Sequence, residues 1–136
     1  MTFTPDHVLQ ERLTTAPLIW LTTNSPTGQP SPRPVWFFWT GEHVVIYSRP
    51  DAAKLRHIAV QPKVSLNFNC NDVTGREVDV IAGLAEPAPD LPPLSRLPGF
   101  VEKYTERIKY AGLHVPAIEA AFSTPLRVEP LRAWRL

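Results

Sequence analysis

Cysteine is nearly absent from this sequence, and its scarcity excludes two kinds of stabilising site. Cys70 is the only cysteine among the 136 residues, so the chain can form neither an internal disulfide nor a multi-cysteine zinc site. This usage fits a reducing compartment, and we expect the protein in the cytoplasm. The four histidines are scattered and lack metal-ligand spacing, so we expect no metal site.

Long apolar segments are also missing. The longest apolar runs, residues 78–85 and 34–39, fall far short of the ~20 residues that span a bilayer. Residues 1–20 lack the basic start and long apolar stretch of an export signal. We therefore expect neither membrane insertion nor export.

The sequence has almost no net charge, because 14 basic residues oppose 13 acidic ones. This net charge does not indicate a nucleic-acid-binding surface, and we expect no nucleic-acid partner. The charge is unevenly distributed, however: residues 41–69 carry two more basic than acidic side chains, and residues 70–100 carry three more acidic than basic ones. The basic segment indicates a local anion site.

What is present is the composition of a globular protein. Hydrophobic residues make up 43% and charged residues 20% of the chain, which excludes a disordered or coiled-coil protein. The length predicts a single domain over residues 1–136. Sixteen prolines and four tryptophans stand out, since prolines interrupt strands and the aromatics indicate a broad apolar surface.

Strands dominate the expected fold. Six are expected, at residues 18–23, 30–39, 43–49, 63–69, 77–86 and 126–136, with an Asn/Asp/Gly turn at 69–75 and Pro130 at an edge or bulge. Four helices are expected: one capped by Thr4 with Pro5 in its first position, one from Asp51 to Val60 ended by Pro62, and two at 100–111 and 116–122 after an irregular proline-rich connector at 87–99. This order favours a mainly β (α+β), mostly antiparallel barrel with helices in its connections and after the fifth strand.

The second expected strand has prolines at every other position. Pro30, Pro32 and Pro34 remove backbone donors from one edge of the strand, while Arg33 and Val35 keep theirs for the other edge. The donor-free edge can face solvent, a loop or a flat heteroaromatic ring. From the pattern alone, an ordinary edge strand with one core face remains the simpler interpretation.

A second candidate site joins the end of the third strand to the following helix. Ser48 and Arg49 end the strand, and Lys54 lies in the first turn of the helix, where free amides and the helix dipole favour an anion. Lys54 and Arg56 lie ~200° apart around the helix, so one phosphate cannot contact both. Lys54 is the better candidate because it borders the apolar face, although a solvated loop would explain the same residues.

Catalytic constellations are absent from the sequence. No carboxylate and histidine pattern stands out, no G-x-S-x-G elbow is present, and Cys70 has no neighbour that would activate it. An enzyme of this kind would depend on an organic cofactor for the difficult step. The catalytic residues are therefore unknown from sequence.

Four segments stand out in order along the sequence: RPVWFFW at 33–39, VIYSR at 45–49, KLRHI at 54–58 and PKVSL at 62–66. These segments and their order resemble the pyridoxamine 5′-phosphate oxidase-like split β-barrel superfamily, and more closely its probable deazaflavin (F420)-dependent oxidoreductases. The likeness extends over nearly the whole chain, including Lys103 and Tyr104 and the segment TPLRVEP at 124–130.

The resemblance implies a six-stranded, FMN-binding-like split barrel that forms a homodimer with two cofactor sites at its interface. It implies that the backbone of Arg33, Pro34, Val35, Trp36 and Phe37 borders a flavin-type ring. Ser48, Arg49 and Lys54 would hold the phosphate of FMN or of the deazaflavin coenzyme F420.

The implied activity is hydride or electron transfer between that cofactor and a small organic substrate. The alternatives are an FMN-dependent, pyridoxamine 5′-phosphate oxidase-like flavoprotein and a non-catalytic carrier of a flavin, haem or other tetrapyrrole. True pyridoxamine phosphate oxidases have a longer, basic C-terminal segment, whereas this sequence ends LRAWRL. Oxidation of pyridoxamine 5′-phosphate, a form of the vitamin, is therefore not expected.

Overall fold

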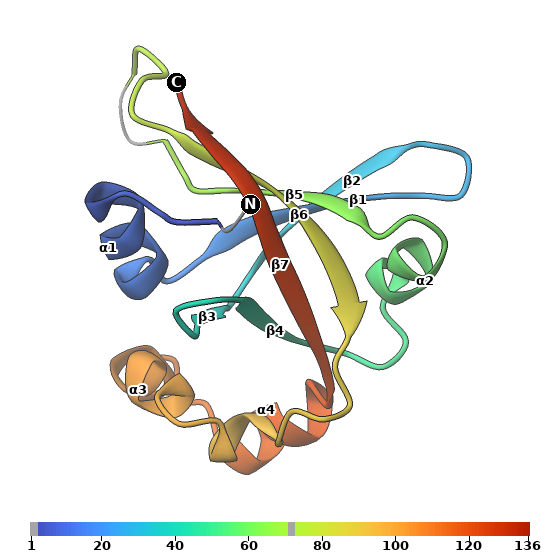
Figure 1. The fold of residues 1–136 in the computed structure, drawn as a ribbon. Coiled ribbons are helices and arrows are strands. Elements are labelled where there is room, and N and C mark those ends of the chain that lie inside the picture. The colour runs from blue at the N-terminus through green and yellow to red at the C-terminus, as the bar shows by residue number, and fades with distance from the viewer. Residues whose placement is uncertain (1–2, 71–72) are drawn as a thin grey trace.

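Seven antiparallel strands form one sheet in this computed structural model, which describes residues 3–70 and 73–136. The order across the sheet is β2-β1-β5-β6-β7-β4-β3 (Figure 1). The strands are β1 (Ile19–Asn24), β2 (Pro30–Val35), β3 (Phe38–Trp39), β4 (Val44–Ser48), β5 (Lys63–Asn67), β6 (Asp79–Pro87) and β7 (Thr124–Arg135). The mainly antiparallel sheet with helices is therefore confirmed, with seven strands rather than six.

The additional strand arises because the run expected at 30–39 is interrupted at Phe37. The backbone N–H of Phe37 donates to the Tyr104 hydroxyl at 2.9 Å, and Lys103 Nζ donates to the Phe37 carbonyl at 2.9 Å. Helix α3 (Phe100–Tyr110) thus satisfies the peptide groups that a continuous strand would give to a neighbouring strand. Strand β2 ends before this point, and β3 begins after it.

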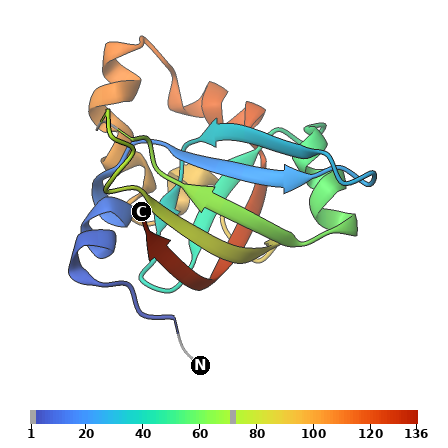
Figure 2. The same cartoon turned by 90° about the horizontal axis from the view of Figure 1, so that it is seen from above.

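This interruption also curls the sheet. In the part of the chain that the structure describes, β2 pairs only with β1 and β3 pairs only with β4, so these two strands lie at opposite edges of the sheet. Residues 36–37 alone connect them, which requires the two edges to approach each other. Figure 2 shows the resulting half-barrel, in which the strands wrap around a common interior.

The helices begin at different residues from those expected. Helix α1 (His7–Thr15) is capped by Asp6, whose carboxylate accepts from the Leu9 amide at 2.8 Å, so Thr4 is not the cap and Pro5 lies outside the helix. Helix α2 (Ala53–Val60) begins after Ala52 with no side-chain cap, so Asp51 does not cap it. Its end before Pro62 is confirmed.

The later part of the chain adds two helices and a short turn beneath β4 (Figure 1). Helix α4 (Val115–Ala121) follows α3, and a single 3₁₀ turn, η1 (Leu94–Arg96), interrupts the connector expected to be wholly irregular. Pro130 pairs with Gly83 while Arg132 pairs with Ala82, so the bulge expected near Pro130 is confirmed. The turn expected at 69–75 lies partly outside the described residues.

Two apolar clusters lie on the two faces of β4, all of whose residues are buried. Val44 and Ile46 point into the barrel interior, where they meet residues of α1, β1, β5, β6 and β7. Val45 and Tyr47 point the other way and pack with η1 and α3. Alternation along one strand therefore joins the barrel to its helical layer. No helix in the described residues is long and apolar enough to cross a membrane.

Candidate functional site

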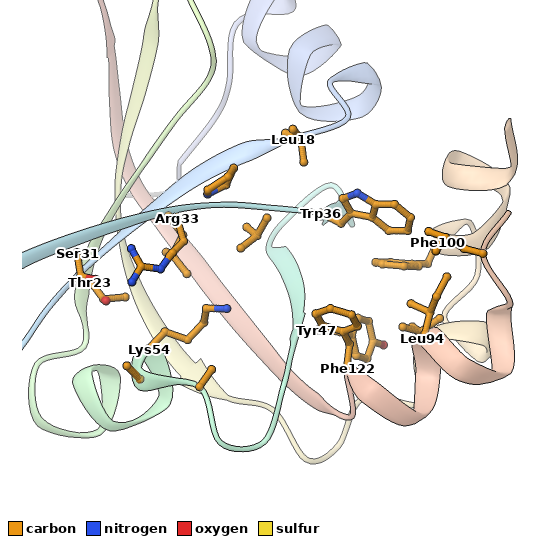
Figure 3. Close-up of a pocket in the computed structure, with 17 residues that line it drawn as sticks. Leu18, Thr23, Ser31, Arg33, Trp36, Tyr47, Lys54, Leu94, Phe100 and Phe122 are labelled. Atoms are coloured by element: carbon orange, nitrogen blue, oxygen red, sulfur yellow. The ribbon is translucent and has the colours of Figure 1, made fainter. Parts of the chain in front are cut away.

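A cavity of about 650 Å³ lies between the barrel and its helical layer. Its volume is in the range of small-molecule and cofactor sites. Strands β1, β2 and β4, the start of α2, and the α3 and α4 region all contribute residues (Figure 3). The lining residues are Leu18, Leu21, Thr23, Ser31, Arg33, Pro34, Val35, Trp36, Tyr47, Ala52, Ala53, Lys54, Leu94, Phe100, Leu113, Ile118 and Phe122.

One end of the cavity is cationic. Arg33 from β2 and Lys54 from α2 both extend into this end (Figure 3), and no carboxylate lines the cavity among the described residues. Burial, with the nearby charge of Arg33, holds the pKa of Lys54 below its ordinary value. The uncapped start of α2 adds the positive end of a helix dipole. An anion such as phosphate would relieve the repulsion between the two cations.

Two hydroxyl groups complete this cationic end. Ser31 and Thr23 are paired across β2 and β1 and both line the cavity. The Thr23 hydroxyl also lies 2.8 Å from Nδ1 of His57, one turn along α2 from Lys54. Hydroxyl groups beside cations provide further hydrogen-bonding positions for phosphate oxygens.

The opposite end of the cavity is aromatic and apolar. Trp36, Tyr47, Phe100 and Phe122 gather there (Figure 3). The Tyr47 hydroxyl donates to the Pro92 carbonyl at 2.6 Å, and burial raises the pKa of Tyr47 to about 12. This end can therefore receive a flat ring but offers no charged group to it.

Helix α3 fixes the position of Trp36 in the cavity wall. The Tyr104 ring stacks on the Trp36 indole with centroids 4.1 Å apart and an interplanar angle of 3°. The Tyr104 hydroxyl accepts from the Phe37 amide and lies 2.8 Å from the Pro17 carbonyl, to which it donates. Because one face of the indole is covered by Tyr104, Trp36 can offer the cavity only its other face and its edge.

Lys103, next to Tyr104, is a partly buried cation with an unusual environment. Its Nζ donates to the Phe37 carbonyl and lies 3.6 Å from the centroid of the Phe37 ring. Burial, with a smaller contribution from Arg107, lowers the pKa of Lys103 to about 8. Lys103 and Tyr104 together hold the backbone that connects β2 to β3.

The cavity brings together five of the eight residues that the sequence proposed for cofactor binding. Arg33, Pro34, Val35, Trp36 and Lys54 line it, whereas Arg56 of the same helix does not. Phe37 is fully buried behind the wall. Ser48 is also buried and donates its hydroxyl to the Arg49 carbonyl, and the Arg49 guanidinium lies over the Phe122 ring at 4.8 Å. These last three residues do not line the cavity.

The sequence analysis missed two groups of lining residues. Thr23 and Ser31 were not identified, although their strands were expected and their pairing follows from a short hairpin. The residues of η1, α3 and α4 were not identified because their contact with β4 joins segments far apart in the sequence. A proline-rich connector gives no periodicity from which its docking could be read.

Comparison with known proteins gives one match by sequence family and many by structure. Residues 5–131 match the family described as pyridoxamine 5′-phosphate oxidase. No curated protein sequence matches the chain.

Three solved structures illustrate the range of similar proteins. An F420 reductase superposes with a TM-score of 0.67 at 25% identity, covering 91% of this chain and 94% of its own. A FAD-binding protein from Mesorhizobium loti has a TM-score of 0.68 at 17% identity, covering 96% and 90%. The haem storage protein HutZ from Vibrio cholerae has a TM-score of 0.67 at 13% identity, covering 99% and 95%.

The family match covers most of the sequence, and the half-barrel with its helical layer agrees with these structures. On this evidence the chain belongs to the pyridoxamine 5′-phosphate oxidase family.

Proposed function

We propose that this protein is an oxidoreductase that transfers hydride or electrons between a bound flavin-type cofactor and a small organic substrate. The deazaflavin coenzyme F420 is the leading candidate for the cofactor, and FMN is the alternative. The F420 reductase and the FAD-binding protein among the similar structures support a flavin-type ring. We place the protein in the cytoplasm, as its cysteine usage indicates.

The observation that carries this proposal is the division of one cavity into a cationic end and an aromatic end. Arg33 and Lys54 would hold a phosphate, and the uncapped start of α2 lines the same cavity with Ala52 and Ala53. The backbone of β2 and the Trp36 side chain would border a ring. A ligand whose phosphate lies beside Arg33 and Lys54 and whose tricyclic ring lies along β2 as far as Trp36 matches this arrangement.

The residues of this chain would then bind and orient rather than carry out acid–base chemistry. When bound in its reduced form, a flavin or deazaflavin ring supplies two electrons and a proton as a hydride and is itself oxidised, and a solvent proton can complete the reduction of the substrate. The aromatic wall would exclude water from the ring. The described lining contains no carboxylate, which is consistent with residues that bind and orient the ligands while the cofactor supplies the hydride.

A non-catalytic carrier of a flavin, haem or other tetrapyrrole is the second candidate. The broad apolar end and the similarity to a haem storage protein favour it. However, the described lining contains no histidine, cysteine or methionine that could ligate haem iron. A carrier of this kind would bind a ring without transferring electrons to a substrate.

Titration and turnover distinguish these candidates. The purified protein is titrated separately with FMN, F420 and haemin while absorbance is recorded. We expect saturable binding of F420 or FMN in preference to haemin, followed by reoxidation of the reduced cofactor under anaerobic conditions when an unsaturated carbonyl compound is added. Binding of haemin alone would contradict the proposal, and cofactor binding without reoxidation by any such compound would favour the carrier.

A further inference from the structure

The side chains at the aromatic end of the cavity indicate which class of substrate this end can bind. Six lining residues form this end and none is charged: Trp36, Tyr47, Leu94, Phe100, Ile118 and Phe122. Trp36 and Tyr47 belong to the barrel side, and the other residues come from the helical layer. If a ring borders β2, the space that faces η1 and α4 remains for a second molecule.

The charged groups nearest to this end are engaged elsewhere. The Arg49 guanidinium lies over the ring of Phe122. The Glu119 carboxylate, on α4, accepts from the Ser95 amide at 2.9 Å and does not line the cavity. Neither group faces a ligand at the aromatic end.

Two side chains at this end carry a polar group, Tyr47 and Trp36. Tyr47 donates its hydroxyl proton to the Pro92 carbonyl, so it can offer a ligand only a lone pair, and Trp36 carries one neutral donor, its indole N–H. A carboxylate or phosphate oxygen brought here would lose its hydration and could accept from these side chains at most that one neutral donor. An uncharged ring would instead exchange water for contact with four aromatic side chains.

We propose that the part of the aromatic end that faces η1 and α4 binds an uncharged, largely apolar, ring-bearing substrate and discriminates against carboxylates and phosphate esters. This inference rests on the proposed function, because the cofactor phosphate occupies the cationic end. Pyridoxamine 5′-phosphate carries a phosphate of its own and would need a second cationic end. Within the described residues, the cavity has only the one formed by Arg33 and Lys54.

Three probes that share one ring test the charge preference: 2-naphthalenemethanol, 2-naphthoate and 2-naphthyl phosphate. Their affinities are measured by tryptophan fluorescence with saturating inorganic phosphate present to fill the cationic end. We expect the alcohol to bind at least about tenfold more tightly than either anion. Equal affinity of 2-naphthoate and the alcohol, or no binding of the alcohol, would overturn the inference.

A charge placed in the wall tests the location. Ile118→Lys is expected to reverse the preference, so that 2-naphthoate binds about tenfold more tightly than the alcohol. Ala117→Lys is the matched control, because Ala117 is exposed on the same helix and does not line the cavity. If folded Ile118→Lys keeps the wild-type preference, the substrate does not lie at this end.

These measurements need no cofactor and therefore separate two kinds of failure. Loss of F420 and FMN binding with the probe preference intact would reject the proposed function alone. Cofactor binding without the probe preference would reject the substrate class alone.

Discussion

At the scale of single residues, Lys54 is the clearest test of the cationic end. Lys54→Ala should weaken cofactor binding by ~1.5–3 kcal/mol, or roughly 10- to 150-fold, because a charge-assisted phosphate contact is lost. Arg56→Ala is the matched control, since Arg56 lies on the same helix but hydrogen bonds to the Asp51 carbonyl outside the cavity. Calorimetric titration with the cofactor measures both. Equal effects of the two substitutions on cofactor affinity would show that the cofactor phosphate does not bind at the cationic end.

Lys103 gives a prediction about pH and stability. Its pKa is about 8 in the folded protein and 10.5 as the ordinary value, so between these values the unfolded chain binds more protons than the folded one. The contribution of Lys103 to the free energy of unfolding should therefore rise as the pH increases from 8 toward 10.5. Below this range, the buried charge is a constant cost.

Urea unfolding of wild type and Lys103→Met at several pH values checks this sign. The stability of the wild type relative to the variant should increase with pH across that window. Lys109→Met, at an exposed position of the same helix, controls for the loss of a lysine. A difference between wild type and Lys103→Met that is independent of pH would show that the buried amine does not titrate there.

At the scale of elements, α3 is the part that shapes the cavity wall. Tyr104→Phe keeps the ring that stacks on Trp36 but leaves the buried Phe37 amide without its acceptor. The expected cost is about 1–3 kcal/mol of unfolding free energy. Tyr110→Phe is the control because Tyr110 is exposed at the end of the same helix.

Denaturant unfolding and cofactor titration of Tyr104→Phe should be read together. A role in the wall predicts weaker cofactor binding in the folded variant as well as lower stability. Wild-type stability would mean that the hydroxyl is not needed to interrupt the strand. Lower stability with unchanged cofactor affinity would show that the Tyr104 hydroxyl stabilises the fold and has no role in cofactor binding.

The elements also show which features sequence can predict. Periodicity and turn residues identified all the long strands and helices, because these signals are local. The alternating prolines of β2 correctly indicated an edge strand, since β2 pairs only with β1 among the described strands. The break at Phe37 was missed because its cause, Tyr104, lies 67 residues later in the chain. The separation along the chain between β4 and the later helices likewise hid the aromatic end. Lys54 could be found from local pattern, whereas Arg33 was expected to border a ring with its backbone rather than to join Lys54 at the cationic end.

At the scale of the whole molecule, one strand edge lacks a partner among the described residues. The first half of β7 pairs with both β4 and β6, but beyond Val128 the only described strand that pairs with it is β6. This second half carries two exposed large apolar side chains, Leu131 and Trp134, and exposed Leu136 follows the strand. An open strand edge beside apolar side chains is a surface that association usually covers.

We expect a second copy of the chain to cover this surface in a homodimer, because two-fold pairing closes an interface that is open on each protomer. Sedimentation at micromolar concentration should show a dimer for the wild type. Leu131→Asp with Trp134→Asp should raise the dimer dissociation constant by at least about tenfold, since each change places an unpaired charge in the contact. Val60→Asp, which changes an exposed apolar residue at the end of α2, should leave the dimer intact.

If the cofactor site is completed by the partner, the double variant should also lose cofactor affinity while the Val60→Asp protein keeps it. A wild-type protein that sediments only as a monomer and binds the cofactor fully would exclude both the assembly and a shared site.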